Sequence, residues 1–148
     1  MTQVVTTGWP DRLLTLGDWE SLPADELHDV EVLLSPAPLT VRSPDVLVAA
    51  TAVVSAKPPR FGAADVSLVV EIMSEGSRRA DRVTTLSEHA DAGIGHYWII
   101  DLDDPVSLVH HRLDAKGAYQ HVRTYHGHME VVFGGATVRV DLDALSSP

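Results

Sequence analysis

The sequence contains no cysteine, which excludes a disulfide framework, a thiolate zinc site and a cysteine nucleophile. A bound metal ion would therefore need oxygen or imidazole ligands. No stretch is long and apolar enough for a membrane-spanning helix, and the first residues lack the basic and apolar segments of a signal peptide. We therefore expect a cytoplasmic protein that has no membrane partner.

Positive charge is also scarce. Only Lys57 and Lys116 are lysines among 11 basic residues, and the net charge is -10. Non-specific binding of nucleic acid depends on contacts between basic side chains and phosphates, so this balance argues against a broad phosphate-binding surface. A local patch remains at Arg78, Arg79 and Arg82. Arginines so spaced on a helix are more often a solvated face, so both DNA binding and simple solvation stay open.

The length and composition predict one globular domain. The chain has 148 residues, of which 45% are apolar, enough to bury a single core. We expect one domain over residues 1–148, comprising a short N-terminal helix and strand (about 15–35), a core (44–112) and C-terminal β-hairpins (118–141). The helix is expected at Leu16–Leu22 and the strand at Glu31–Leu34.

Two β-branched runs in the core predict a pair of antiparallel strands. They are Asp45–Ser55 and Val66–Ile72, and the turn-forming sequence KPPRFG (57–62) lies between them. If Asp45 lies opposite Glu71, paired residue numbers sum to 116 and the turn is centred at residue 58, inside that sequence. Directly opposed residues point to the same face of a sheet, so the two carboxylates would converge.

Glu71 is unusual because it interrupts the apolar run LVVEIM. An ionised carboxylate inside a sheet is unfavourable unless a cation, a proton or hydrogen-bond donors satisfy it. Two converging carboxylates suit Mg²⁺ or Mn²⁺, which prefer oxygen ligands. The alternative is that Asp45 begins a strand after Pro44 and Glu71 reaches solvent at a sheet edge. The residues alone favour neither interpretation.

The second half of the chain predicts a helix followed by strands. The helix should begin at Ser77 and end near Gly93, and a buried strand, HYWIIDLD, follows at 96–103. The apolar stripe of the helix is expected at Ala80, Val83, Leu86 and Ala90. A strand, helix and strand in this order form a right-handed crossover, so the two strands should be parallel. Short strands are expected at Val106–Arg112, Ala118–Tyr125, His128–Phe133 and Ala136–Val140, with Gly134-Gly135 as a two-residue turn. This pattern predicts a mixed α/β fold.

Several short motifs then follow one another in a characteristic order. They are ELHDVE (26–31), SPAP (35–38), PDVLV (44–48), VVEIMS (69–74), Arg79 with Asp81-Arg82, ADAG (90–93) and YWIID (97–101). Over roughly residues 15 to 115 the chain resembles the Uma-two family of endonucleases, a branch of the PD-(D/E)XK restriction-endonuclease-like superfamily. The ordered series is far more specific than any single acidic residue.

The resemblance implies a restriction-endonuclease-like mixed sheet flanked by helices, here with additional C-terminal antiparallel strands. It implies that Asp45 and Glu71 are catalytic metal ligands and that the backbone carbonyl of Ile72 is a further ligand. The ion would be Mg²⁺ or Mn²⁺, and the reaction would be hydrolysis of phosphodiester bonds in DNA. The resemblance does not decide whether Glu26 or Glu31 adds another ligand.

The chain departs from the family pattern at its catalytic cation. The superfamily's lysine would fall at Met73, and relatives in this family place a lysine on the following helix, at the position of Thr85. Asp81, Thr85 and His89 are four residues apart, so they share one helix face and are accessory candidates. Only Leu39–Ser43 separate the SPAP and PDVLV motifs, where relatives have a helix and a strand. These departures predict a weak or inactive nuclease.

The alternative function is a non-catalytic module for binding or assembly, derived from a nuclease fold. Loss of a covering helix should expose apolar surface near Val46, Val48 or Val69. Large exposed apolar patches usually mark interfaces, so we expect a homodimer.

A histidine site is a weaker candidate. His126 and His128, with His121, would line one side of a strand pair and bind a transition metal. Histidines on an exposed hairpin are more often solvated, so we favour the solvated interpretation.

Overall fold

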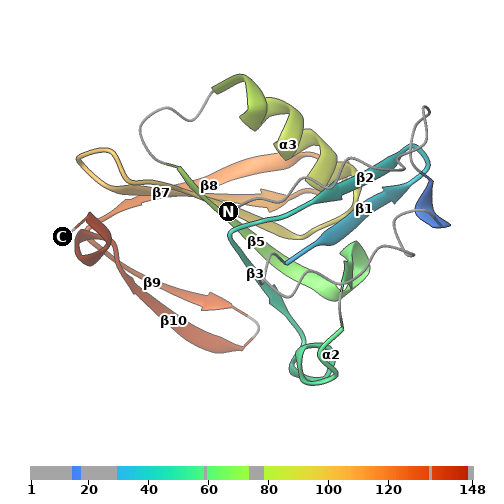
Figure 1. Cartoon of the computed structure of the whole chain (residues 1–148). Helices are drawn as coiled ribbons and strands as arrows, with labels where there is room; N and C mark the ends of the chain where they lie inside the picture. Colours follow the sequence, from blue (N-terminus) through green and yellow to red (C-terminus); the bar gives the residue numbers. More distant parts are fainter. Residues whose placement is uncertain (1–14, 18–29, 59, 74–78, 134, 147–148) are drawn as a thin grey trace, which may run out of the picture.

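The computed structural model describes residues 15–17, 30–58, 60–73, 79–133 and 135–146 (Figure 1). Residues 16 and 17 are helical, and the rest of the predicted N-terminal helix, Leu16–Leu22, lies outside the described residues. None of the described helices has the length and apolar character that crossing a membrane requires.

A five-stranded mixed sheet forms the centre of the fold. Its strand order is β3-β5-β6-β7-β8, and only β5 and β6 run parallel. The strands are β3 (Val46–Ala49), β5 (Val66–Met73), β6 (His96–Asp101), β7 (Ser107–Leu113) and β8 (Tyr119–His126). Helix α3 (Arg79–Asp91) connects β5 to β6 and covers one face of the sheet, as the crossover predicts (Figure 1). The fold is α/β and restriction-endonuclease-like, as expected. β8 extends this sheet instead of forming a separate C-terminal hairpin.

The predicted pairing of the first two arms is confirmed in its register. Residues of β3 and β5 pair so that their numbers sum to 116, as in Val46 with Val70 and Val48 with Leu68. The predicted continuation of the first arm to Ser55 is wrong, because helix α2 (Thr51–Ser55) follows β3. After a bulge Ala49 pairs with Val66, where β5 begins, so none of the described strands lies opposite the residues that follow Ala49.

A second, three-stranded sheet has the order β2-β1-β4. Its strands are β1 (Val32–Pro36), β2 (Leu39–Arg42) and β4 (Phe61–Gly62). β1 confirms the strand predicted at Glu31–Leu34. The short connection at Leu39–Ser43 is therefore mainly a strand, which pairs antiparallel with β1. The expected turn at 57–62 is more elaborate than predicted, since β4 pairs with β1 and the 3-10 helix η1 (Ala63–Asp65) follows it.

The remaining strands form a separate hairpin, β9 (His128–Phe133) with β10 (Ala136–Asp141), and the 3-10 helix η2 (Asp143–Ser146) follows. Phe133 pairs with Ala136, which confirms the predicted two-residue turn, and Gly135 has a φ of 80° there. In Figure 1 the hairpin and α3 lie on opposite sides of the central sheet.

Each face of the central sheet has its own core. The helix-side core lies beneath α3 and the second sheet and consists of Val32, Val66, Val69, Met73, Ile94, Tyr97 and Ile99. The hairpin-side core lies against β9, β10 and the start of η2 and consists of Leu68, Val70, Trp98, Ile100, Val106, Leu108, Met129 and Leu142. Successive residues of β5 point to opposite faces, so this strand contributes to both cores.

Two predictions about burial need correction. Val83 is 73% exposed, because the buried face of α3 is turned toward Leu86, His89 and Ala90. Val69 is fully buried in the helix-side core, so it needs no further cover.

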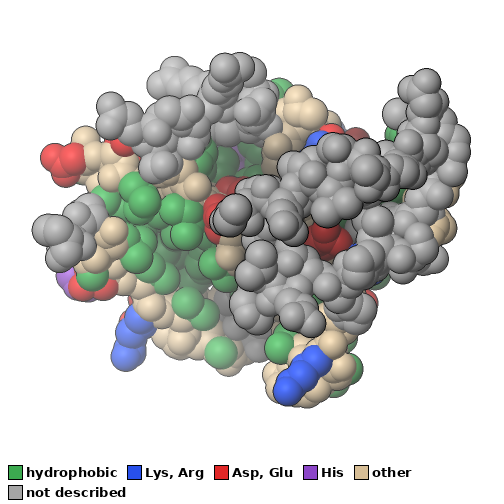
Figure 2. All heavy atoms as spheres, viewed as in Figure 1, with side chains coloured by type: hydrophobic (Ala, Val, Ile, Leu, Met, Phe, Trp, Pro, Cys, Tyr) green, Lys and Arg blue, Asp and Glu red, His purple; other side chains and the backbone are tan. Residues whose placement is uncertain are grey.

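The expected apolar exposure does occur on β3. Val46 and Val48 are 46% and 36% exposed. Their pairing with Val70 and Leu68 puts them on the hairpin-side face, at the edge strand of the sheet. Figure 2 shows a broad hydrophobic area beside the position of the β9–β10 hairpin in Figure 1.

Candidate active site

Asp45 and Glu71 meet beside the first residue of β3. The Val46–Val70 pair fixes the register, and one further step along each strand brings Asp45 opposite Glu71. The Asp45 carboxyl lies close enough to Glu71 to raise the pKa of Glu71, both by its charge and as a hydrogen-bond partner. The structure thus brings the two carboxylates together on one face, as the register predicts.

The surroundings of Glu71 are apolar. It alternates with Val69 and Met73 on the helix-side face of β5, and its neighbour on β6 is Ile99. Burial in this environment, followed by the charge and hydrogen bond of Asp45, raises the pKa of Glu71 from 4.5 to about 7. Near neutral pH the pair therefore holds a proton that two isolated carboxylates would have lost.

The backbone of Ile72 orients the pair. Its N–H donates a hydrogen bond to Oδ2 of Asp45 at 2.7 Å. The N–H and C=O of one strand residue point to the same side, so the carbonyl of Ile72 also faces the β3 edge. Two carboxylates and one carbonyl are thus available as oxygen donors. The Ile72 carbonyl was predicted as a ligand but its N–H was not predicted as a donor, although the same backbone alternation places both on this side of the strand.

On α3, His89 is a fully buried core residue. Its ring packs edge-on against Tyr97 with centroids 5.1 Å apart, and Nδ1 hydrogen-bonds the carbonyl of Thr85 at 2.6 Å. Burial lowers the pKa of His89, so the ring is neutral at pH 7. Tyr97 is paired with Val69, two residues before Glu71. His89 is thus set back from the acidic pair and enclosed by the core.

Thr85 lies nearer to the acidic pair than His89 does, when position is measured along the direction of β6. The crossover makes α3 run antiparallel to β6. Thr85 precedes His89 by one helical turn, about 6 Å, and Ile99 follows Tyr97 by about 7 Å along the strand. Because His89 contacts Tyr97, Thr85 lies at about the level of Ile99, the strand partner of Glu71.

The family model for Uma2, described as "Putative restriction endonuclease", matches residues 10–140. The chain belongs to the Uma2 family. Among curated proteins none matches it. The matched region includes both sheets, α3 and the greater part of the β9–β10 hairpin, and extends beyond the 15–115 over which the motifs carry the resemblance.

At the position where the resemblance to the PD-(D/E)XK superfamily implies a lysine, this Uma2 chain has Met73, which is buried in the helix-side core. The other predicted positions are described only in part. Arg78 lies outside the described residues, as do the side chains of Arg79, Asp81 and Arg82 at the start of α3. Their assignment to DNA contact, or to an accessory role for Asp81, stays a prediction.

Glu26 and Glu31 are the two candidates for an additional metal ligand. Glu26 lies outside the described residues. Glu31 accepts a hydrogen bond from Nε of Arg60 at 3.1 Å, and its carbonyl accepts one from the N–H of Phe61. Glu31 is thus attached to the segment that forms β4.

The weaker candidate, a site of three histidines, does not form, and His121, His126 and His128 are all exposed, as the favoured interpretation expects. His121 hydrogen-bonds Thr124 at 2.9 Å, and His126 contacts the carbonyl of Val106 at 3.2 Å. His128 starts the separate β9–β10 sheet, because the chain leaves the central sheet at Gly127, where φ is 70°. His128 lies instead beside Asp141, which the sequence analysis did not single out.

Proposed function

We propose that this Uma2 chain is a metal-dependent endonuclease of the PD-(D/E)XK superfamily that hydrolyses phosphodiester bonds in DNA. The observation that carries the proposal is the convergence of Asp45 and Glu71 on one face of the sheet, since apolar burial and mutual repulsion make it a place where positive charge is favoured. The family's description as a restriction endonuclease supports the same reaction class.

The donor set fits Mg²⁺ or Mn²⁺. Asp45, Glu71 and the Ile72 carbonyl offer oxygen ligands only, which hard divalent cations prefer. A divalent charge would compensate both carboxylates and favour the ionised form of Glu71. Asp45 and Glu71 are therefore assigned as the catalytic metal ligands.

The chain's own contribution to catalysis is positioning. When bound, the ion supplies Lewis acidity and lowers the pKa of an attacking water. The Ile72 N–H holds Asp45 in one orientation, and Glu71 is held between core residues of β5. Ligands fixed in this way need no reorganisation as charge develops on the phosphate. Arg78, Arg79 and Arg82, at the start of α3, are assigned to contact the DNA backbone.

The activity should be weak. Lysine is absent at both expected places, which Met73 and Thr85 occupy. A threonine hydroxyl donates a hydrogen bond but brings no charge to stabilise the developing phosphate anion. The buried His89 does not replace the lysine, because it is enclosed in the core and neutral.

A plasmid-nicking assay with Mn²⁺, repeated with Mg²⁺, tests the proposal. We expect slow nicking by the wild type that falls about 10²-fold or more in Asp45→Asn, in line with the loss of a preorganised electrostatic group. The matched control is Asp65→Asn, because Asp65 is an exposed carboxylate in η1. Calorimetry should show Mn²⁺ binding by the wild type and by Asp65→Asn. A wild type that neither binds Mn²⁺ nor nicks DNA refutes the proposal.

Assembly is the second candidate function, and the exposure of Val46 and Val48 supports it. They lie on an edge strand, where another strand can be added to the sheet. We expect sedimentation to show a homodimer at micromolar concentration, which Val48→Lys dissociates. Val83→Lys is the matched control, because Val83 is still more exposed but lies on α3. A wild type that sediments as a monomer at that concentration contradicts this role.

A further inference from the structure

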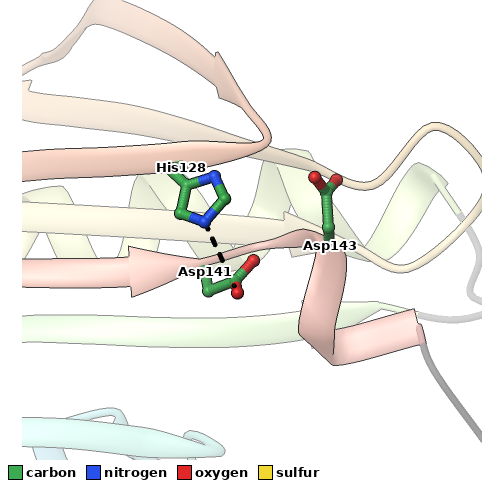
Figure 3. Close-up of side chains that lie close together, drawn as sticks. All are labelled: His128, Asp141 and Asp143. Atoms are coloured by element: carbon green, nitrogen blue, oxygen red, sulfur yellow. Dashed lines mark ion pairs between the residues drawn. The ribbon is translucent and has the colours of Figure 1, made fainter.

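A second group of metal-ligating side chains lies where β9 begins and β10 ends. His128, Asp141 and Asp143 each offer one ligand atom, and these atoms all lie within 4.8 Å of one another. Figure 3 shows the imidazole of His128 facing Asp141, with Asp143 on the turn that follows β10. None of these residues belongs to the acidic pair of β3 and β5.

The backbone around this group is fixed by pairing and by burial. His128 and Asp141 are direct partners in the antiparallel register, so their side chains lie on the same face of the hairpin. The N–H of Leu142 donates to the carbonyl of Gly127 at 2.7 Å, and the Leu142 side chain is fully buried in the hairpin-side core. The segments that carry the three ligands are thus held against each other.

The Asp141 carboxylate is oriented as a one-oxygen ligand. Its Oδ1 accepts a hydrogen bond from the N–H of Ala144 at 3.3 Å, while Oδ2 lies 3.5 Å from Nε2 of His128. Two ligands at about 2.0–2.1 Å from a tetrahedral ion are roughly 3.3 Å apart. The separation of the imidazole nitrogen and the carboxylate oxygen is already close to this value. The hydrogen bond from the Ala144 N–H to the other carboxylate oxygen is also typical of metal sites, where such contacts orient the ligands.

We propose that His128, Asp141 and Asp143 bind a divalent transition-metal ion, for which Zn²⁺ is the natural probe. A neutral imidazole and two carboxylates together carry the charge that balances a divalent cation. Imidazole favours Zn²⁺, Co²⁺ or Ni²⁺ over Mg²⁺ and Ca²⁺, so the preference of this site differs from that of Asp45 and Glu71. Three protein ligands leave a coordination position for water. The ion would link η2 to both strands of the hairpin.

The test is calorimetric titration with Zn²⁺ of the full chain, with Asp45→Asn in every sample to remove the other acidic site. In that background we expect one Zn²⁺ to bind per chain. His128→Asn or Asp141→Asn should lower the affinity for Zn²⁺ at least about tenfold, since even the loss of a residue that only supports a ligand typically has this effect. His121→Asn and Glu130→Gln are the matched controls, because they remove an exposed imidazole from β8 and an exposed carboxylate from β9. Both should bind as the parent does.

Two outcomes overturn the proposal. One is that the parent binds no Zn²⁺ in this background. The other is that His128→Asn and Asp141→Asn bind Zn²⁺ as tightly as His121→Asn, which means that the ion associates with surface histidines and carboxylates in general. Thermal melts in chelator establish that the variants fold, and exposed positions such as these should leave the melting temperature unchanged. Because no sample retains Asp45, neither result depends on nuclease activity.

Discussion

The two groups of candidate metal ligands differ in burial and in donor chemistry. Glu71 is set among apolar neighbours of the helix-side core, and Asp45 adds a second carboxyl against it. His128 and Asp141 have side chains that are 77% and 50% exposed at the end of a hairpin. Water screens charges at the exposed site, whereas burial keeps the acidic pair from losing its proton near neutral pH. The buried pair should therefore respond strongly to cations and to pH, and the exposed group only modestly.

The largest expected effect is a gain of activity at the buried site. Thr85→Lys brings a cation to the level of Glu71 on the helix that covers it, where charge stabilisation of the phosphate is missing. We expect plasmid nicking with Mn²⁺ to rise about 10²-fold, the lower end of the usual range for one well-placed acid–base or electrostatic group. The rise should disappear when Thr85→Lys is combined with Asp45→Ala.

The matched control is Thr84→Lys, which adds the same charge one residue away at an exposed position of α3. An equal rise in both variants would show that lysine acts by attracting DNA to the surface of the helix. No rise in Thr85→Lys, in a protein that folds and binds metal, would favour the assembly role over nuclease activity.

The sequence predicted the central sheet and the acidic pair well, because both follow from local patterns. The β-branched runs, the crossover and the register were enough to bring Asp45 opposite Glu71. The pKa of Glu71 was beyond this reasoning, since it depends on how deeply Val69, Met73 and Ile99 enclose the carboxyl group. That depth is set by tertiary packing.

The predictions from sequence were wrong where the structure depends on contacts between distant chain segments, or on whether the end of a strand has a partner strand. Helix α2 occupies the predicted continuation of β3, because in the described part of the chain no strand pairs with residues beyond Ala49. The histidines of 121–128 were grouped by proximity in sequence, yet Gly127 separates two sheets. Only the fold of the hairpin brings His128 to Asp141 and Asp143.

The smaller expected effect is on the pH dependence of the free energy of unfolding in the absence of metal. The comparison is between Glu71 at the buried site and Asp141 at the exposed site. Glu71→Gln keeps a donor for Asp45 and resembles the protonated acid. Because the pKa of Glu71 is raised in the folded state, from 4.5 to about 7, the folded protein binds more protons than the unfolded chain between these values. The free energy of unfolding of the wild type should therefore fall as pH rises through this window, and the loss is complete above about pH 7.

Glu71→Gln lacks this loss. Urea titrations in chelator should find it about as stable as the wild type at pH 4.5 and more stable at pH 8. At about 1.4 kcal/mol per pKa unit the rise from 4.5 to about 7 corresponds to about 3 kcal/mol, and solvent screening of this half-buried carboxyl reduces the expected difference to about 2 kcal/mol. Asp141→Asn is the comparison at the exposed site, and its difference from the wild type should stay nearly constant over the same range, because screened surface carboxylates contribute little. If Glu71→Gln and the wild type keep the same difference at both pH values, the pKa of Glu71 is not raised, and the acidic pair loses this support as a place where positive charge is favoured.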